Sequence, residues 1–480
     1  MGTTEPADAA AAGPAGEGPP GPADLEALAA WVAVPSVSSD PDRAGDVRRS
    51  ARLLAEEMRR AGATRAEIWE TPGLPAVFGH MPAADPRAPR LLVYSHHDVH
   101  AADPAEWRTT RPFTPLLRGG RLHGRGASDA KGQLMAHLWA LRAHTAGRSA
   151  PAVSVAYLVE GEEETGSGHL ADLLSEHADD LAADVVMVSD TMLWSLSVPA
   201  VCAAVRGSVT ATLTVRGADR DLHSGAVSGA AANAAAELCR LLAQLRDDSG
   251  RVALPGFHDD VAAPGPALRA SLDALPFDPG DWLARTGTYS ADGENGFAVP
   301  ERLWTRPAFE VARLTAGRTD TPALGLIPAE ASADLLFRLV PDQRADRVEE
   351  LLRSWLADRR RPGYRYGLEI ADTGSDPYRT PEDHPALAAL DRAVGRAYGA
   401  PALRVGNGGA APAAQLARAC GAPVLFFGTG LPGDGWHGRD EYADIRALRL
   451  GVRALTAFLD ELPSAPGLRR PGSHLPAGPA

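Results

Sequence analysis

Four short apolar runs each lead into residues that can bind a metal or transfer a proton. Short runs rich in Val, Leu and Tyr are typical of buried strands. They cover residues 91–94, 153–159, 184–188 and 422–427, and they precede His96, Asp98, the acidic segment 160–164, Asp190 and His437. In open α/β sheets, ligands bind beyond the carboxyl ends of the strands. We therefore expect these side chains to meet at one edge of a sheet.

The acidic segment 160–164 (E-G-E-E-E) has two explanations. Carboxylates gathered at one strand end repel one another, so either solvent or a cation must separate them. A solvated acidic turn is the commoner case for a single segment. Because three other apolar runs also end in His or Asp, a metal site built from distant segments is favoured.

A different pattern begins near residue 207. Residues 209–215 (V-T-A-T-L-T-V) alternate as a half-exposed antiparallel strand does. Helical spacing follows at 231–245 and 345–359, and strand patterns follow at 308–314, 331–340 and 364–370. This order predicts a β-α-β-β-α-β unit, the ferredoxin-like α+β arrangement, with an extra segment at about 250–305.

The predicted domains follow from these patterns, because the metal-type strands lie on both sides of the α+β unit. A chain of 480 residues exceeds what one core usually fills. We expect a catalytic domain at 24–207 and 378–462, with a domain inserted at 208–377. Residues 1–23 and 463–480, rich in Ala, Gly and Pro, are predicted to be disordered tails.

Composition narrows the class of protein. The formal net charge of −13 argues against nucleic acid or an anionic membrane as partner. No apolar run reaches the roughly 18 residues that a membrane span needs. The 3 cysteines have no metal-finger spacing and are expected to be reduced thiols, which predicts a cytoplasmic protein.

Asp129 lies in a Gly-rich stretch, G-R-G-A-S-D-A-K-G at 124–132, just before a predicted helix. The helix dipole favours an anion there. The commoner explanation of an Asp at this place is a plain N-cap.

Seven motifs carry a family resemblance. They are S-H-H-D-V (95–99), G-R-G-A-S-D-A-K-G (124–132), E-G-E-E-E-T-G-S (160–167), V-S-D (188–190), D-L-H-S-G (221–225), R-L-V-P (338–341) and W-H-G-R-D-E (436–441). As a set they resemble the M20 family of metallopeptidases, closest to its carnosinase-like and broad-specificity dipeptidase branch. The resemblance covers about residues 24 to 462. It implies a mixed-sheet α/β catalytic domain and an inserted lid that also mediates dimerisation.

The resemblance also implies a centre of two divalent metal ions, most often Zn²⁺, with Mn²⁺ or Co²⁺ as alternatives. His96 and Asp190 would hold one ion, Glu164 and His437 the other, and Asp129 would bridge them. Imidazole and carboxylate are suitable ligands for Zn²⁺, and two neighbouring ions need a shared anion.

Two further residues near these ligands resemble the family's catalytic groups. Asp98, two residues after His96 and expected on the same strand face, would orient the imidazole. Glu163 neighbours a ligand without being one, so it would act as general base toward the attacking water and return the proton to the leaving amine.

The inserted domain offers three candidates. His223 resembles the histidine that stabilises the oxyanion from the partner subunit of a dimer, although a surface turn would equally explain it. Arg338 resembles the guanidinium that binds the free carboxylate of the substrate. Asn233 resembles a further contact with the substrate, although an Asn near a helix start is more often a cap.

One segment departs from the family. Close relatives have R-E-G-G-S-I-P, whose Ser and backbone hold the terminal carboxylate, where this chain has G-N-G-G-A-A-P at 406–412. Gly408 and Gly409 are retained as substrate-binding candidates, but Ala410 replaces the hydroxyl. The departure affects substrate choice and leaves the metal residues untouched.

The resulting hypothesis is a cytoplasmic, dimeric, two-metal hydrolase of dipeptides or similar small amides with a free carboxylate. One alternative keeps the site and changes the substrate, as an N-acyl-amino-acid deacylase or a biosynthetic amide hydrolase. Another is a dimeric homologue without catalytic activity, which is disfavoured because every expected ligand and the base are present.

Overall fold

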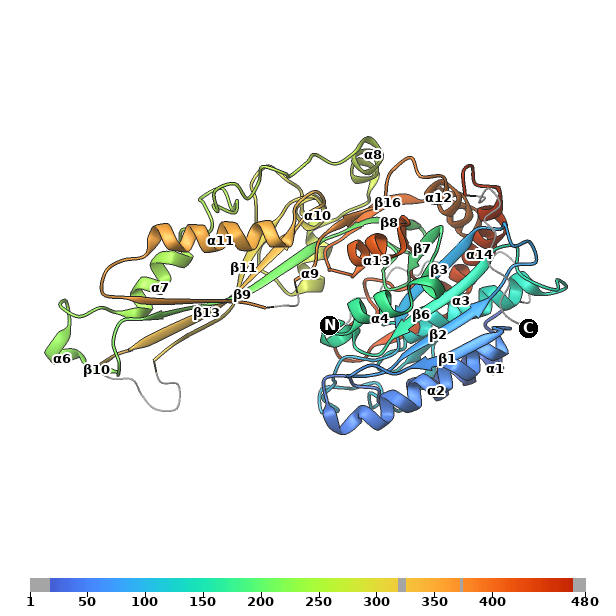
Figure 1. Cartoon of the computed structure of the whole chain (residues 1–480), viewed down its shortest axis with the longest axis horizontal. Coiled ribbons are helices and arrows are strands. Elements are labelled where there is room, and N and C mark those ends of the chain that lie inside the picture. Colours follow the sequence, from blue (N-terminus) through green and yellow to red (C-terminus); the bar gives the residue numbers. More distant parts are fainter. Residues whose placement is uncertain (1–17, 318–324, 372–373, 469–480) are drawn as a thin grey trace.

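The structure, a computed structural model, describes residues 18–317, 325–371 and 374–468. It contains two large sheets, which are joined where β8 (Ala200–Val205) leads into β9 (Gly207–Arg216). In Figure 1 they lie along the long axis of the molecule, with β9, β11 and β13 in the left-hand arm and β1, β2, β3 and β6 in the right-hand body.

The larger sheet has nine strands in the described part of the chain, and it is mixed. Four neighbouring strands, β6, β3, β7 and β17, are parallel to one another, while both margins are largely antiparallel. β16 (Leu403–Asn407) pairs with β8 beside the main path. The main path is β1 (Arg65–Trp69), β2 (Ala76–Met81), β6 (Ser154–Glu160), β3 (Arg90–His96), β7 (Val185–Val188), β17 (Val424–Phe426), β8 and β15 (Tyr378–Arg379).

Helices cover both faces of this sheet, because alternate strand residues point to opposite sides. Leu91 and Val93 face one core and Leu92 and Tyr94 face the other. The first core is closed by α1 (Pro22–Val32), α2 (Ala44–Arg60), α3 (Lys131–Thr145), α12 (Pro385–Tyr398) and α14 (Ile445–Glu461), and the second by α4 (Leu170–Glu176), α5 (Ala178–Leu181) and α13 (Ala413–Cys420). A small sheet of β4 (Leu116–Arg118), β5 (Arg121–His123) and β18 (Tyr442–Asp444) lies apart.

The second large sheet has the antiparallel order β11-β13-β9-β14, which is the strand order of a ferredoxin-like unit. Alternation along β9 is complete: Val209, Ala211, Leu213 and Val215 are buried under helices, and the intervening polar residues are not. The elements are α7 (Ala234–Leu242), β11 (Ala308–Ala316), β13 (Glu330–Leu339), α11 (Ala345–Arg359) and β14 (Arg365–Ile370). The α/β class and the mixed sheet predicted from the sequence are confirmed.

The remaining elements lie at the tip of the arm and in the predicted extra segment. β10 (Leu222–His223) pairs with β12 (Leu326–Ile327) beside the short helix α6 (Ser224–Val227). The segment predicted at 250–305 carries α8 (Pro266–Ala274), α9 (Pro279–Thr286) and α10 (Val299–Trp304).

The predicted ends of the ordered chain need correction. α1 begins at Pro22, because Pro is suited to the first helical turn and the Asp24 carboxylate accepts the Gly21 N–H at 3.0 Å. At the other end, residues 463–468 are structured: a 3₁₀ turn covers Leu462–Ser464, and Leu468 packs on the first core. The rest of the two predicted tails, 1–17 and 469–480, lies outside the described residues.

No helix within the described ranges is both long and apolar enough to cross a membrane.

Candidate functional site

The candidate site forms beyond the carboxyl ends of the four parallel strands. His96 is the last residue of β3, Asp190 follows β7 by two residues, and Glu164 lies in the 3₁₀ turn Glu163–Thr165 just after β6. His437 comes from the loop after β17. Because these strands are neighbours in the sheet and share one direction, their ends lie side by side, as the apolar runs predicted.

The structure brings five candidate ligands together in two groups that share Asp129. Ligand atoms of His96, Asp129 and Asp190 lie within 4.8 Å of one another, and so do those of Asp129, Glu164 and His437. The two carboxylate oxygens of Asp129 face different histidines: Oδ1 is 3.2 Å from His96 Nε2, and Oδ2 is 3.1 Å from His437 Nε2. His437 Nε2 is also 3.1 Å from Glu164 Oε2, and His96 Nε2 is 3.9 Å from Asp190 Oδ1.

Asp129 does not cap the following helix. The residue at the N-cap position of α3 is Ala130, and no side chain caps it. The carboxylate is instead buried between the two imidazoles, so the plain N-cap explanation is not what the structure shows.

Electrostatics at this place favour cations. The Asp129 and Glu164 carboxylates beside it raise the pKa of His437 to about 10, against the opposing effect of burial. Burial, together with Asp129 and Glu164, raises the pKa of Asp190, and the buried Asp190 Oδ1 has no hydrogen-bond partner in the described structure. Several carboxylates around two imidazoles leave an excess of negative charge that divalent cations would neutralise.

Asp98 contacts His96, but not as a strand neighbour. β3 ends at His96, so the prediction that both residues share a strand face is wrong. The chain turns there, which puts Asp98 Oδ1 3.4 Å from His96 Nδ1. The same carboxylate accepts the backbone N–H groups of Glu163 at 3.3 Å and Glu164 at 3.1 Å, so it also fixes the turn that carries them.

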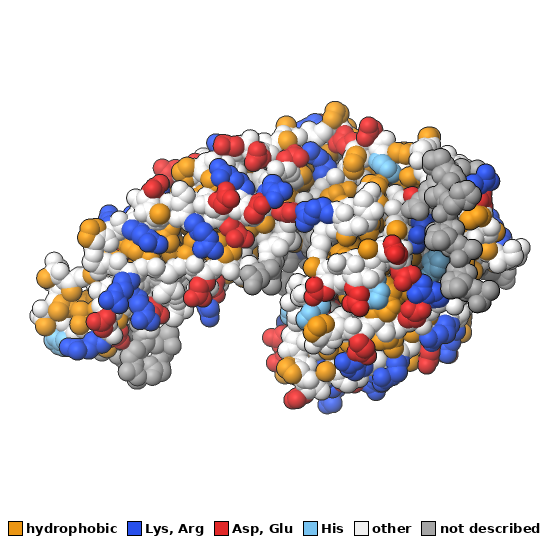
Figure 2. All heavy atoms as spheres, in the orientation of Figure 1, with side chains coloured by type: hydrophobic (Ala, Val, Ile, Leu, Met, Phe, Trp, Pro, Cys, Tyr) orange, Lys and Arg blue, Asp and Glu red, His pale blue; other side chains and the backbone are white. Residues whose placement is uncertain are grey.

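Glu163 faces a cavity of about 600 Å³ between the body and the arm. Burial is the main cause of its raised pKa, and the neighbouring Asp190 and Glu164 charges act in the same direction. Residues of both parts line the cavity, among them Ser167, Ser208, Arg344, Ala410 and Gln415. Figure 2 shows the surface indented between the arm and the body.

The candidates of the arm do not join this group within one chain. His223 is exposed and lies in β10, at the tip of the arm that points away from the body (Figure 1). Arg338 is half-buried at the near end of β13, and no described carboxylate pairs with it. Asn233 caps α7, its side-chain oxygen accepting the Ala236 N–H at 3.1 Å.

The segment 406–412 is held by one of its own side chains and by Arg206. Asn407 Oδ1 accepts the Gly409 N–H at 2.8 Å, so this backbone donor, a candidate for substrate binding, already has a partner. Arg206 Nε donates to the Gly408 carbonyl at 3.1 Å. Burial and the nearby Arg338 charge lower the pKa of Arg206 to about 10.

Three residues near the site received no role from the sequence. The His100 ring stacks on the His437 ring at 4.6 Å between centroids, and its backbone N–H donates to Glu164 Oε1 at 3.0 Å. Arg125 and Glu441 form a buried ion pair of 2.7 Å between the segments that carry Asp129 and His437. Arg125 and Glu441 both occur in motifs of the family resemblance, but a motif does not show which backbone groups these two residues bind.

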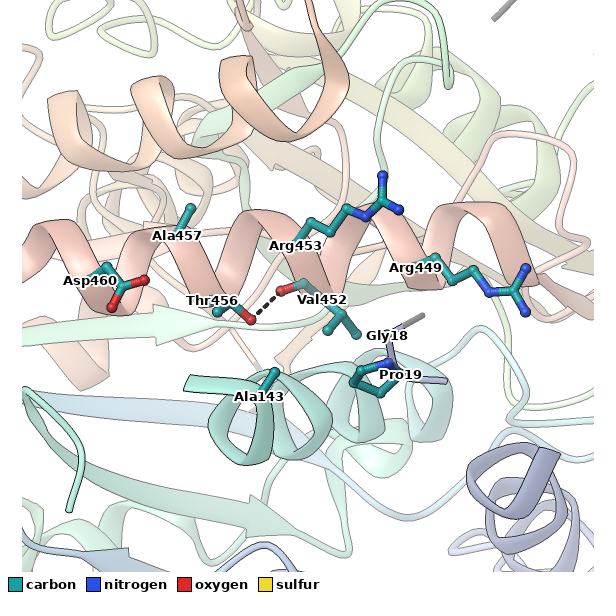
Figure 3. Close-up of a pocket in the computed structure, with 9 residues that line it drawn as sticks. All are labelled: Gly18, Pro19, Ala143, Arg449, Val452, Arg453, Thr456, Ala457 and Asp460. Carbon is teal, nitrogen blue, oxygen red and sulfur yellow. Dashed lines mark hydrogen bonds between the residues drawn. The ribbon is translucent and has the colours of Figure 1, made fainter. Parts of the chain in front are cut away.

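A second groove, of about 380 Å³, lies away from these residues. It runs between α14 and α3, where Gly18 and Pro19 cross close to Val452 and Ala143 (Figure 3). The side chains of Arg449 and Arg453 extend away from Pro19 in this view, and among the described residues that line the groove there is no cluster of metal-binding side chains.

Comparisons with known proteins agree with the geometry. Residues 92–461 match the model of peptidase family M20/M25/M40. The chain belongs to this family. It is 27% identical over 454 residues to the Cys-Gly metallodipeptidase dug1 of Schizosaccharomyces pombe, covering 91% of this chain and 95% of that protein. It is 25% identical over 456 residues to the human Beta-Ala-His dipeptidase, covering 91% and 90%.

Solved structures show the same fold. The M20 family metallo-carboxypeptidase Sso-CP2 of Sulfolobus solfataricus superimposes with a TM-score of 0.83 at 27% identity, covering 92% of this chain and 99% of that one. Human carnosine dipeptidase 1 superimposes with a TM-score of 0.76 at 24% identity, covering 92% and 96%. The M20 assignment, the α/β fold and the metallopeptidase class predicted from the sequence are confirmed.

Proposed function

We propose that this chain is a two-metal dipeptidase that hydrolyses dipeptides or similar small amides with a free carboxylate. The observation that carries the proposal is the placement of Asp129, whose two oxygens face one histidine each. A bridging carboxylate between two imidazole-and-carboxylate groups is the arrangement a pair of divalent ions requires.

The relatives support the choice of substrate. The fungal relative is named as a Cys-Gly dipeptidase and the human one as a Beta-Ala-His dipeptidase, and both match over most of their length. Both named substrates are two-residue peptides. A cavity of about 600 Å³ beside Glu163 is of a size that suits a small molecule.

The donor set fits two Zn²⁺ ions, and Mn²⁺ or Co²⁺ would accept the same ligands. His96 and Asp190 would hold one ion, Glu164 and His437 the second, and Asp129 both. Bound ions would polarise the scissile carbonyl and lower the pKa of an attacking water. Asp98 keeps the His96 ring oriented, since its backbone carbonyl lies 3.1 Å and its carboxylate 3.4 Å from Nδ1.

Glu163 is the general base in this proposal. It lies in the same turn as Glu164 and faces the cavity, so its carboxylate can take a proton from water and return it to the leaving amine.

The arm supplies the remaining groups in a dimer. Since His223 lies at the tip of the arm, it would stabilise the oxyanion in the site of a second copy. Arg338, free of a described carboxylate partner, would bind the carboxylate of the substrate. The dimer, the cytoplasmic location and a separate inserted domain at 208–377 are parts of the same proposal.

Glu163→Gln tests the proposal, with metal content measured alongside turnover. We expect the variant to keep the metal content of the wild type and to lose about 10²–10⁴-fold in kcat on dipeptides. Unchanged turnover would remove Glu163 from the role of base. Removal of metal with a chelator should abolish the activity of the wild type, and Zn²⁺ should restore it.

A second candidate function keeps the site and changes the substrate to an N-acyl amino acid. The observation that favours it is the loop 406–412, where Ala410 has no hydroxyl and the Gly409 N–H is occupied by Asn407. A panel of dipeptides against N-acyl amino acids separates the two: the deacylase is supported if kcat/KM is higher for the acylated series.

A further inference from the structure

Glu441 is a fully buried carboxylate that binds the backbone of the segment carrying Asp129. Its two oxygens accept the N–H groups of Gly126 at 3.0 and 3.1 Å, Ser128 at 2.9 Å and Asp129 at 3.0 Å. Residues 124–130 form a bend and turns, outside any helix or strand. Without this carboxylate, three buried N–H groups would lose their partner, at a cost in free energy for each.

Arg125 links the same carboxylate to the segment carrying His437. Its Nη1 donates to Glu441 Oε2 at 2.7 Å, and its Nη2 donates to the carbonyl of Gly438, the residue after His437, at 2.8 Å. The Gly124 N–H donates to the Glu441 carbonyl at 2.9 Å. The two segments are therefore joined at both the side chains and the backbone.

A second link lies between the same segments. Ser128 Oγ donates to Asp434 Oδ2 at 2.6 Å, and the indole N–H of Trp436 donates to Ser128 Oγ at 2.8 Å. Residues next to Asp129 thus bind the segment that carries His437, and residues next to His437 bind the segment that carries Asp129.

We propose that Arg125 and Glu441 act as positioning residues that set the separation between the Asp129 carboxylate and the His437 imidazole. They thereby set the affinity of the ion held by Asp129, Glu164 and His437. The inference rests on the proposed metal centre. A buried ion pair is weak evidence for stability, since its desolvation offsets much of its attraction, whereas its bonds to both ligand-bearing segments point to a positional role.

Glu441→Gln is the first test, because Gln keeps the shape but replaces one accepting oxygen by an amide NH₂ that faces N–H donors. We expect the Zn²⁺ dissociation constant of one of the two ions to rise about 10–100-fold, as loss of a group that supports a metal ligand does. The measurement is titration of metal-free protein with Zn²⁺ against a competing chelator. Melting of the metal-free form is recorded in parallel.

The control is Glu294→Gln, which breaks a less buried ion pair with Arg306, 2.7 Å long, whose two residues belong to neither group of candidate ligands. It should lower the melting temperature and leave both Zn²⁺ constants unchanged. Arg125→Lys keeps a cation near Glu441 but cannot reach Gly438 as well, so it should weaken the same ion less than Glu441→Gln does.

The proposal is overturned if Glu441→Gln and Arg125→Lys are folded without metal and bind both ions as the wild type does. If Glu441→Gln does not fold, Arg125→Lys decides alone. A wild type that binds no divalent ion would instead refute the proposed function, so the two failures are distinguishable.

Discussion

The two large sheets present their candidate residues in opposite ways. In the nine-stranded sheet, four neighbouring parallel strands end at one edge, so side chains from positions 96 to 437 meet there. In the four-stranded sheet, neighbouring strands are antiparallel, and the candidates lie on separate elements at a tip, a helix start and a strand end. One chain therefore contains both groups of candidate metal ligands, while its candidate substrate-binding residues remain dispersed.

The largest effect that tests this contrast is expected at His223. If a second copy supplies this imidazole, His223→Ala should lower kcat about 10²–10³-fold, as loss of an oxyanion donor does. Metal content should not change, because no described metal group contains His223. Steady-state kinetics and metal analysis of the same sample make the measurement.

Mixed dimers show whether His223 acts across the interface. His223→Ala and Glu163→Gln should each be nearly inactive, but if His223 acts in the partner's site, a dimer with one chain of each kind contains one site with both groups intact. Re-equilibrated equal mixtures should regain up to roughly a quarter of wild-type activity by random pairing of subunits. Activity that stays at the level of the single variants would place His223 outside the partner's site.

A substitution of Arg338 tests the difference between the two sheets at the place where they join. Arg338→Lys keeps the charge but loses the bidentate geometry for a carboxylate, so KM for free dipeptides should rise about 10–100-fold. C-terminally amidated substrates, which already lack the carboxylate, are the matched comparison and should change little. An equal loss for both series would contradict the carboxylate role of Arg338.

The sequence predicts well what depends on local pattern. The alternation V-T-A-T-L-T-V at 209–215 specifies β9 with one buried face, and the apolar run at 91–94 specifies the buried strand that ends at His96. The direction shared by the parallel strands then explains why His96, Glu164 and Asp190 come together. The family resemblance adds the pairing of ligands, and the separations observed are compatible with it.

What the pattern could not predict depends on turns and on contacts between distant backbones. Asp98 reaches His96 by a turn after β3, which period-two spacing along a strand does not describe. Glu441 binds N–H groups 312 to 315 residues earlier in the chain, and backbone groups carry no sequence signal. Asn407 lies in the segment 406–412 that departs from the family motif, but only the fold shows that its side chain accepts the Gly409 N–H.

The smallest effect is expected at Asn233, where the structure shows a helix cap and the family resemblance suggests a substrate contact. Asn233→Ala removes the acceptor of the Ala236 N–H and should lower the free energy of unfolding by about 1 kcal/mol. Asn233→Ser keeps a capping oxygen but loses the amide. If Asn233 only caps α7, the Ser variant should match the wild type in both denaturant midpoint and kcat/KM. A Ser variant with wild-type stability and a lowered kcat/KM would instead give the arm a third substrate contact and weaken the contrast between the two sheets.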